Sequence, residues 1–191
     1  MSPMFTIHEP ATDQQIAATL ERVQDESVAY WSAFDTSEFF AKIDGHWSPA
    51  ENVRHLIKSI RPVTKALTLP RLVLRFMFGK PRRNSERWSD IQARYLGLLD
   101  AGGQAGRFAP SEREEPDPEA GRARIMSQFV QANRDLRTAL AKWPDCSLDR
   151  YQLPHPLLGK LTLREMLIFT AYHQTHHLDG VQRRRGELHS E

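Results

Sequence analysis

Residues 162–181 read TLREMLIFTAYHQTHHLDGV and combine a helix start, an apolar stripe and three histidines. Glu165 follows Thr162 by three residues, which is the spacing of a capping box in the first turn of a helix. Apolar residues then recur every three or four positions between Leu163 and Val181, as they do on the buried face of a helix. The stretch therefore predicts a long amphipathic helix whose histidines lie on or beside its apolar face.

The three histidines of this helix point in different directions. His173 and His177 are four residues apart, so their side chains stand one above the other and can bind the same ion. With Leu163 at zero and about 100° per residue, His177 lies about 40° from the centre of the stripe, His173 about 80° and His176 about 140°. We therefore expect His177 to face the core and His176 to face solvent. Spacing alone leaves two interpretations open, core histidines or two metal ligands that need a third from elsewhere.

Three further segments show the same periodicity. Residues 12–34 and 117–143 each carry an apolar stripe at helical spacing. Another helix begins at Ser48, which is followed by Pro49 at the first helical position and by Glu51 three residues after the cap. Four long helices joined by irregular connections predict an all-α fold, a four-helix bundle.

Prolines and glycines divide the middle of the chain. Pro62 is expected to kink or end the second main helix, and Pro70 to separate from it an apolar and basic helical piece over Arg71–Phe78. Between residues 79 and 118 the apolar pattern weakens, with a short helix expected only around Ser89–Leu99. Because this stretch shows no second core, we interpret residues 79–118 as a long irregular insertion between the second and third main helices.

Length and composition are those of a globular protein. The 191 residues, 40% hydrophobic and 26% charged, suit one domain over residues 1–191. Cys146 is the single cysteine, which excludes an intrachain disulfide and a thiolate-rich zinc site, so any metal must use histidine, carboxylate or water. The first residues show no secretory signal pattern and no apolar run approaches the roughly 20 residues of a membrane span. We expect a cytoplasmic protein with no membrane partner.

Charge gives little indication of a macromolecular partner. The formal net charge is +2, but basic residues cluster within residues 71–87 and 183–185. Such clusters can bind phosphate or membrane surfaces, although most are solvated faces and helix ends. No nucleic-acid-binding motif accompanies them, so a nucleic-acid partner is not expected. The first helix is rich in aromatic residues such as Tyr30, Trp31 and Phe34, and from these we expect a homodimer.

Two stretches resemble a known family. Residues 47–56, WSPAENVRHL, resemble the "W-S-x-x-E/Q…H-L" start of the second helix in DinB/YfiT-like metalloenzymes. Residues 155–162, HPLLGKLT, and 172–178, YHQTHHL, resemble the "H-P-x-x-G-x-L-T…H-x-x-H-H-L" pattern near the C-terminus of that family. The resemblance implies a four-helix bundle that carries one divalent ion, nickel or zinc most often.

Carried over residue by residue, the resemblance implies that His55, His173 and His177 are the metal ligands. The helical wheel selects the last two but leaves His55 undecided, because His55 projects away from the apolar stripe of its own helix. His155, which precedes a proline in the connection to the last helix, has two interpretations. It either approaches the site as an acid–base residue or orients the connection through a hydrogen bond.

Two classes of function follow. In the first, three imidazoles leave coordination positions open and the protein is a metal-dependent enzyme acting on a small molecule. The resemblance implies a transferase for low-molecular-weight thiols or a hydrolase. A zincin-type peptidase is disfavoured, because no His-Glu-x-x-His motif is present. In the second class, the protein is a non-catalytic stress-response or binding protein in which the metal is structural or absent.

Overall fold

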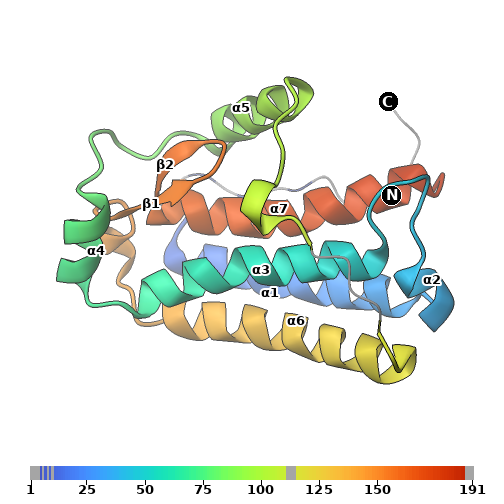
Figure 1. Ribbon diagram of the computed structural model, residues 1–191. Helices are drawn as coiled ribbons and strands as arrows, with labels where there is room; N and C mark the ends of the chain where they lie inside the picture. The colour runs from blue at the N-terminus through green and yellow to red at the C-terminus, as the bar shows by residue number, and fades with distance from the viewer. Residues whose placement is uncertain (1–4, 6, 8, 10, 111–114, 188–191) are drawn as a thin grey trace.

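Four long helices form the body of the protein (Figure 1). The computed structural model describes residues 5, 7, 9, 11–110 and 115–187. The helices of the bundle are α1 (Asp13–Ser32), α3 (Pro49–Thr68), α6 (Pro118–Leu140) and α7 (Leu163–Arg184). Helices α1 and α3 each pack on both α6 and α7. The first two of these four helices, α1 and α3, therefore lie diagonally opposite each other in the bundle, and so do α6 and α7. The predicted four-helix bundle is confirmed.

Shorter elements connect these helices, and the strands that precede α7 pack against it. A two-stranded antiparallel hairpin precedes α7, with His155 opposite Gly159 at its turn. The sequence analysis missed it, because each strand has four residues and neither alternates long enough to be recognised. The shorter elements are α2 (Thr36–Phe40), α4 (Arg71–Phe78), α5 (Trp88–Asp100), the 3-10 helices η1 (Gly106–Phe108) and η2 (Asp145–Ser147), and the strands β1 (Gln152–His155) and β2 (Gly159–Thr162).

The two predicted capping boxes are present. The Ser48 hydroxyl accepts a hydrogen bond from the backbone N–H of Glu51 at 3.2 Å, and the Glu51 carboxylate accepts one from the N–H of Ser48 at 2.8 Å. Thr162 and Glu165 make the same pair of bonds at 3.2 and 2.7 Å. Both helices that carry the candidate ligands therefore begin at a residue set by local sequence.

Pro62 was one of two residues expected to kink or end the second main helix, and the helix does not end there. Helix α3 continues through Pro62 to Thr68, and Pro70 then separates it from α4 as predicted. Beyond Pro62, the side chains of Val63, Ala66 and Leu67 are buried in the core. Their burial offsets the roughly 3 kcal/mol that an interior proline costs a helix.

The core fills the space between the four helices. Trp31 and Phe129 have no exposed surface, and Phe34 is 4% exposed. Trp31 of α1 and Phe34 just after it therefore stabilise the monomer, whereas Tyr30 is half-buried, and the homodimer stays a prediction. None of the helices in the described part of the chain is long and apolar enough to cross a membrane.

The predicted insertion is partly helical and covers the bundle. Its helix α5 confirms the short helix expected around residues 89–99 and lies above α7 in Figure 1. Trp88 and Tyr95 on α5 are buried, and their rings contact Tyr172 and Phe169 of α7 respectively. The insertion thus forms a cover over the middle of the last helix, where the histidines lie.

Candidate metal centre

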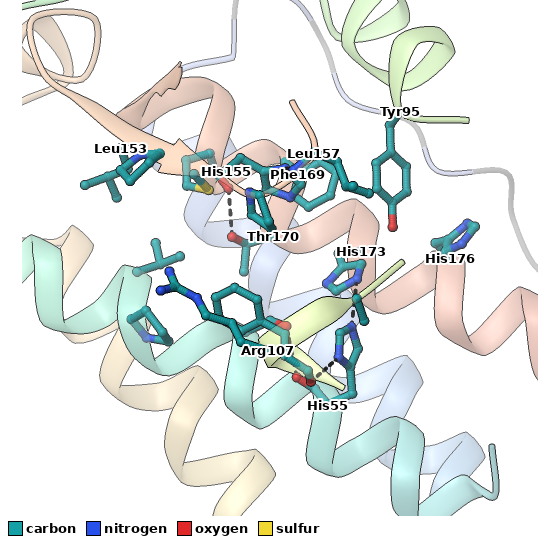
Figure 2. Close-up of a pocket in the computed structure, with 18 of the residues that line it drawn as sticks. His55, Tyr95, Arg107, Leu153, His155, Leu157, Phe169, Thr170, His173 and His176 are labelled. Carbon is teal, nitrogen blue, oxygen red and sulfur yellow. Dashed lines mark hydrogen bonds between the residues drawn. The ribbon is translucent and has the colours of Figure 1, made fainter. Parts of the chain in front are cut away.

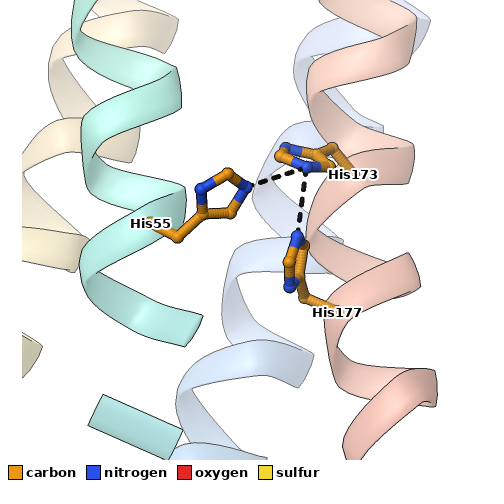
Figure 3. Close-up of side chains that lie close together, drawn as sticks. All are labelled: His55, His173 and His177. Atoms are coloured by element: carbon orange, nitrogen blue, oxygen red, sulfur yellow. Dashed lines mark hydrogen bonds between the residues drawn. The ribbon is translucent and has the colours of Figure 1, made fainter. Parts of the chain in front are cut away.

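Three histidines from two helices converge at one point (Figure 3). His55 comes from the second turn of α3, and His173 and His177 come from successive turns of α7. The Nε2 atom of His173 lies 3.2 Å from Nε2 of His55 and 3.1 Å from Nε2 of His177. Nitrogen ligands bound about 2.1 Å from a tetrahedral ion are about 3.4 Å apart, so this spacing is close to that of a metal site.

The outer nitrogens of two of these rings are held by oxygen acceptors. Nδ1 of His55 lies 2.8 Å from the carbonyl oxygen of Phe108, and Nδ1 of His177 lies 2.7 Å from Oδ1 of Asn52. The Asn52 amide is itself oriented, because its Nδ2 donates to the carbonyl oxygens of Trp47 and Ser48. Both Nδ1 atoms must therefore carry the hydrogen, which leaves Nε2 of each neutral ring as a bare lone pair.

The donor set fits a cation. Nε2 of His173 can give a hydrogen to one neighbouring ring at a time, so without a cation at least one of the two close N···N contacts brings lone pairs together. An extra proton is disfavoured, because burial lowers the pKa of His55, His173 and His177. A metal ion bound by all three lone pairs removes this repulsion.

The burial of the histidines corrects the helical wheel. His173, expected at the edge of the core, is 9% exposed, whereas His177 is half-buried. His55 is 4% exposed, because α3 packs on both α6 and α7 and the side away from its main stripe is covered as well. The prediction that His176 faces solvent is wrong. Its ring lies 5.6 Å from that of Tyr95 on α5, and burial lowers its pKa to about 4.

A largely apolar cavity of about 390 Å³ adjoins the three histidines (Figure 2). Its walls come from α3, α7, the β1–β2 hairpin and the insertion, and include Phe108, Leu153, Leu157 and Phe169. The Tyr95 hydroxyl points toward the gap between His173 and His176 in Figure 2. Burial raises the pKa of Tyr95 to about 12, so this hydroxyl keeps its proton and can donate a hydrogen bond to a bound molecule.

Of the two roles considered for His155, the structure shows the one in which it orients the connection to the last helix through hydrogen bonds. Its Nδ1 accepts hydrogen bonds from the backbone N–H groups of Leu157 and Leu158, at 3.2 and 3.0 Å. Its ring packs edge-on against Phe169 at 4.5 Å, and burial lowers its pKa to about 4. His155 also lines the cavity, with Nε2 as its remaining hydrogen-bonding atom, so an acid–base role for it stays a prediction.

A second cleft, of about 380 Å³, reaches the histidines from among more polar residues. Asn52 and His177 line it together with Arg183 and Arg184 near the end of α7. Burial and the neighbouring Arg183 lower the pKa of Arg184, which marks an accumulation of positive charge. The three histidines thus lie between an apolar cavity and a basic cleft.

Comparison with known proteins identifies the family. The family model of the DinB superfamily matches residues 19–179. The chain belongs to the DinB superfamily. The chain is also similar in fold to two solved structures. A search of the curated proteins gave no significant match.

The first similar structure is TT2238, described as a four-helix bundle protein. It has 18% sequence identity and a TM-score of 0.55, and the match covers 90% of this chain and 99% of TT2238. The second is YfiT from Bacillus subtilis, described as a probable metal-dependent hydrolase with an unusual four-helix bundle topology. It has 19% identity and a TM-score of 0.52, with 97% of this chain and 94% of YfiT covered. At these identities the two structures support the fold.

The structure adds groups around the DinB histidines that the sequence analysis did not single out. Asn52 lies three residues before His55 in the segment that resembles the family, so an amide one helical turn from a histidine was a usable signal. The Phe108 carbonyl is a backbone group in the insertion and Tyr95 lies on its weakly patterned helix. Neither left a signal in the sequence, because each reaches the site through long-range packing.

Proposed function

We propose that the protein is a metal-dependent enzyme that acts on a small molecule, with His55, His173 and His177 as the ligands of a divalent ion. One observation carries the proposal: the Nε2 atoms of His55, His173 and His177 converge beside a largely apolar cavity. Imidazole ligands suit zinc and nickel, and one of these two is the metal we propose.

The arrangement favours a catalytic over a structural metal. Structural zinc sites are usually closed by four protein ligands, whereas catalytic sites have three and leave one position for water or substrate. Among the described residues, the cluster contains three histidines and no fourth metal-binding side chain. An ion held there lowers the pKa of water or of a thiol, so that a nucleophile is present at neutral pH.

The surroundings suggest how the chain's own residues treat a substrate. The largely apolar cavity can accommodate a hydrophobic group, while Arg183 and Arg184 in the adjoining cleft attract a negative charge. The protonated hydroxyl of Tyr95 can donate a hydrogen bond to the reacting group. Cys146 is exposed in η2, outside both cavities, so a thiol reaction requires the thiol to arrive on a low-molecular-weight substrate. We propose hydrolysis or the transfer of such a thiol as the reaction.

The first test is metal content. The protein, produced without a histidine tag, is loaded with zinc or nickel, desalted and analysed by mass spectrometry for bound metal. We expect close to one ion per chain, and its loss in His55→Ala, His173→Ala and His177→Ala. The matched control is His176→Ala, which removes a neighbouring half-buried histidine that is not in the cluster. A wild-type protein that binds no metal contradicts the proposal.

The second test concerns the reaction. The metal-loaded protein is incubated with activated esters and amides, and separately with a small thiol and an electrophile, and the products are identified by mass. Turnover that disappears with the metal supports an enzyme. If the metal raises the melting temperature but no substrate is turned over, a non-catalytic protein with a structural metal becomes the better interpretation.

A further inference from the structure

Helix α4 lies at one end of the bundle, and α2 lies at the other (Figure 1). Several large apolar side chains of α4 are exposed. Phe76 is 93% exposed, Leu72 82% and Met77 56%, whereas Leu74 is 1% exposed and anchors the helix to the core. Leu72 and Phe76 are four residues apart, so they lie side by side on the outer face. Large apolar side chains grouped this way on a surface mark a site of interaction.

The same surface is strongly basic. The 34 residues from Asn52 to Ser85 contain nine lysines and arginines and no aspartate or glutamate, although the net charge of the whole chain is only +2. Arg71 and Arg75 on α4, and Lys80 just after it, are exposed. Among the described residues, Arg75 has no ion pair that would neutralise it. The exposed apolar stripe is therefore bordered by positive charge.

Several contacts hold α4 in this position. Nε2 of Gln152 donates to the carbonyl oxygens of Phe78 and Lys80, and Nζ of Lys160 also donates to that of Phe78. At the other end of the helix, the Arg71 guanidinium lies 5.1 Å above the ring of Trp143. The outer face of α4 is thus presented by a fixed support.

We propose that α4 docks the protein on an anionic phospholipid surface, with Leu72 and Phe76 entering the boundary between headgroups and acyl chains. Exposed apolar residues bordered by arginines on one helix, with a lysine just beyond its end, are the features of a helix that lies in the membrane interface. The proposal is independent of the metal site. It departs from our expectation of no membrane partner, which rested on the absence of long apolar segments.

Other occupants fit this surface less well. A second copy of the chain, docked through the same face about a two-fold axis, would bring like charges on Arg71 and Arg75 together without acidic partners. A helix of 8 residues is also small for the roughly 800 Å² per partner that a stable interface buries. A nucleic-acid duplex would contact the arginines but would leave the exposed side chains of Leu72 and Met77 without an apolar environment.

Vesicle sedimentation tests the proposal on the full chain. Phosphatidylcholine vesicles with and without phosphatidylglycerol are the probes, and bound protein is measured after centrifugation at low and high salt. We expect binding only when phosphatidylglycerol is present, weakened by salt. The double variant Leu72→Ser/Phe76→Ser should bind about tenfold more weakly or worse, and Arg75→Gln about fivefold. Both changes are at exposed positions, and circular dichroism checks that the helices are retained.

The matched control is Leu96→Ser on α5, which removes a leucine that is 38% exposed outside α4 and should leave vesicle binding unchanged. Three results overturn the proposal. The first is a wild type that remains in the supernatant with phosphatidylglycerol vesicles, and the second is a double variant that binds as the wild type does. The third is a wild-type dimer in sedimentation velocity that dissociates in the double variant, which would make this face a contact between two copies.

Discussion

Replacing Asn52 with alanine tests how the ring of His177 is held for a metal. In the folded protein, Oδ1 of Asn52 accepts from Nδ1 of His177 at 2.7 Å, which keeps the proton on the outer nitrogen and leaves Nε2 free. Loss of such a partner of a metal-bound histidine typically costs 10–100-fold in affinity. We therefore expect Asn52→Ala to weaken metal binding by about 1.4–2.7 kcal/mol.

Aspartate at the same position separates the two roles of the amide. The carboxylate of Asn52→Asp still accepts from His177, so metal affinity should be kept or increased. It cannot donate to the carbonyl oxygens of Trp47 and Ser48, which lie 3.1 and 2.9 Å from Nδ2 of Asn52. Facing these oxygens with a carboxylate should lower the free energy of unfolding of the metal-free protein by about 1–3 kcal/mol.

The assay is a competition titration of zinc against a chromophoric chelator, together with denaturant unfolding of the metal-free protein. Asn133→Ala is the matched control, because Asn133 is also buried, on α6, and donates to a helix carbonyl outside the cluster. It should lower stability and leave zinc affinity unchanged. A folded Asn52→Ala protein that binds zinc as tightly as the wild type would refute the reasoning.

Two further predictions concern other parts of the structure. Hydrogen bonds from Arg164 lower the pKa of Asp145. For Asp149, burial opposes this effect but is outweighed by Arg164 together with the hydrogen bond from Ser85, so its pKa is lowered as well. Since these folded-state pKa values lie below those of the unfolded chain, the stabilisation is present above about pH 4 and is lost as pH falls further, by about 1 kcal/mol in denaturant unfolding. Arg164→Met should make this loss smaller. Separately, Tyr95→Phe should leave metal content unchanged but weaken acetohydroxamate binding to the metal-loaded protein about tenfold by calorimetry. Equal affinity would show that the hydroxyl does not reach the ligand.

Much of the fold could be predicted because its signals are local. The caps at Ser48 and Thr162 involve residues three positions apart, and the apolar stripes reflect the period of a single helix. The continuation of α3 through Pro62 could not be predicted in the same way. It depends on residues that become buried only when α6 and α7 are in place.

The histidines of the candidate site could be predicted from the sequence, whereas most of the groups that surround them could not. A helical wheel assumes one buried face, whereas α3 and α7 are each covered on more than one side. His55 is buried away from its main stripe for this reason, and His176 is covered by Tyr95 from the insertion. The Phe108 carbonyl that holds His55 is a backbone atom, which no pattern of residue types reveals.

The distance along the chain between the histidines determines when an ion can be captured. His55 and His173 are 118 residues apart, and the helices that carry them, α3 and α7, pack together although α6 lies between them in the sequence. Ion capture therefore requires a nearly finished structure, which makes it a late event in the maturation of the protein. Once bound, the ion joins α3 to α7 as a reversible cross-link between distant parts of the chain. It should slow the separation of these two helices strongly and slow the fraying of helix ends elsewhere only slightly.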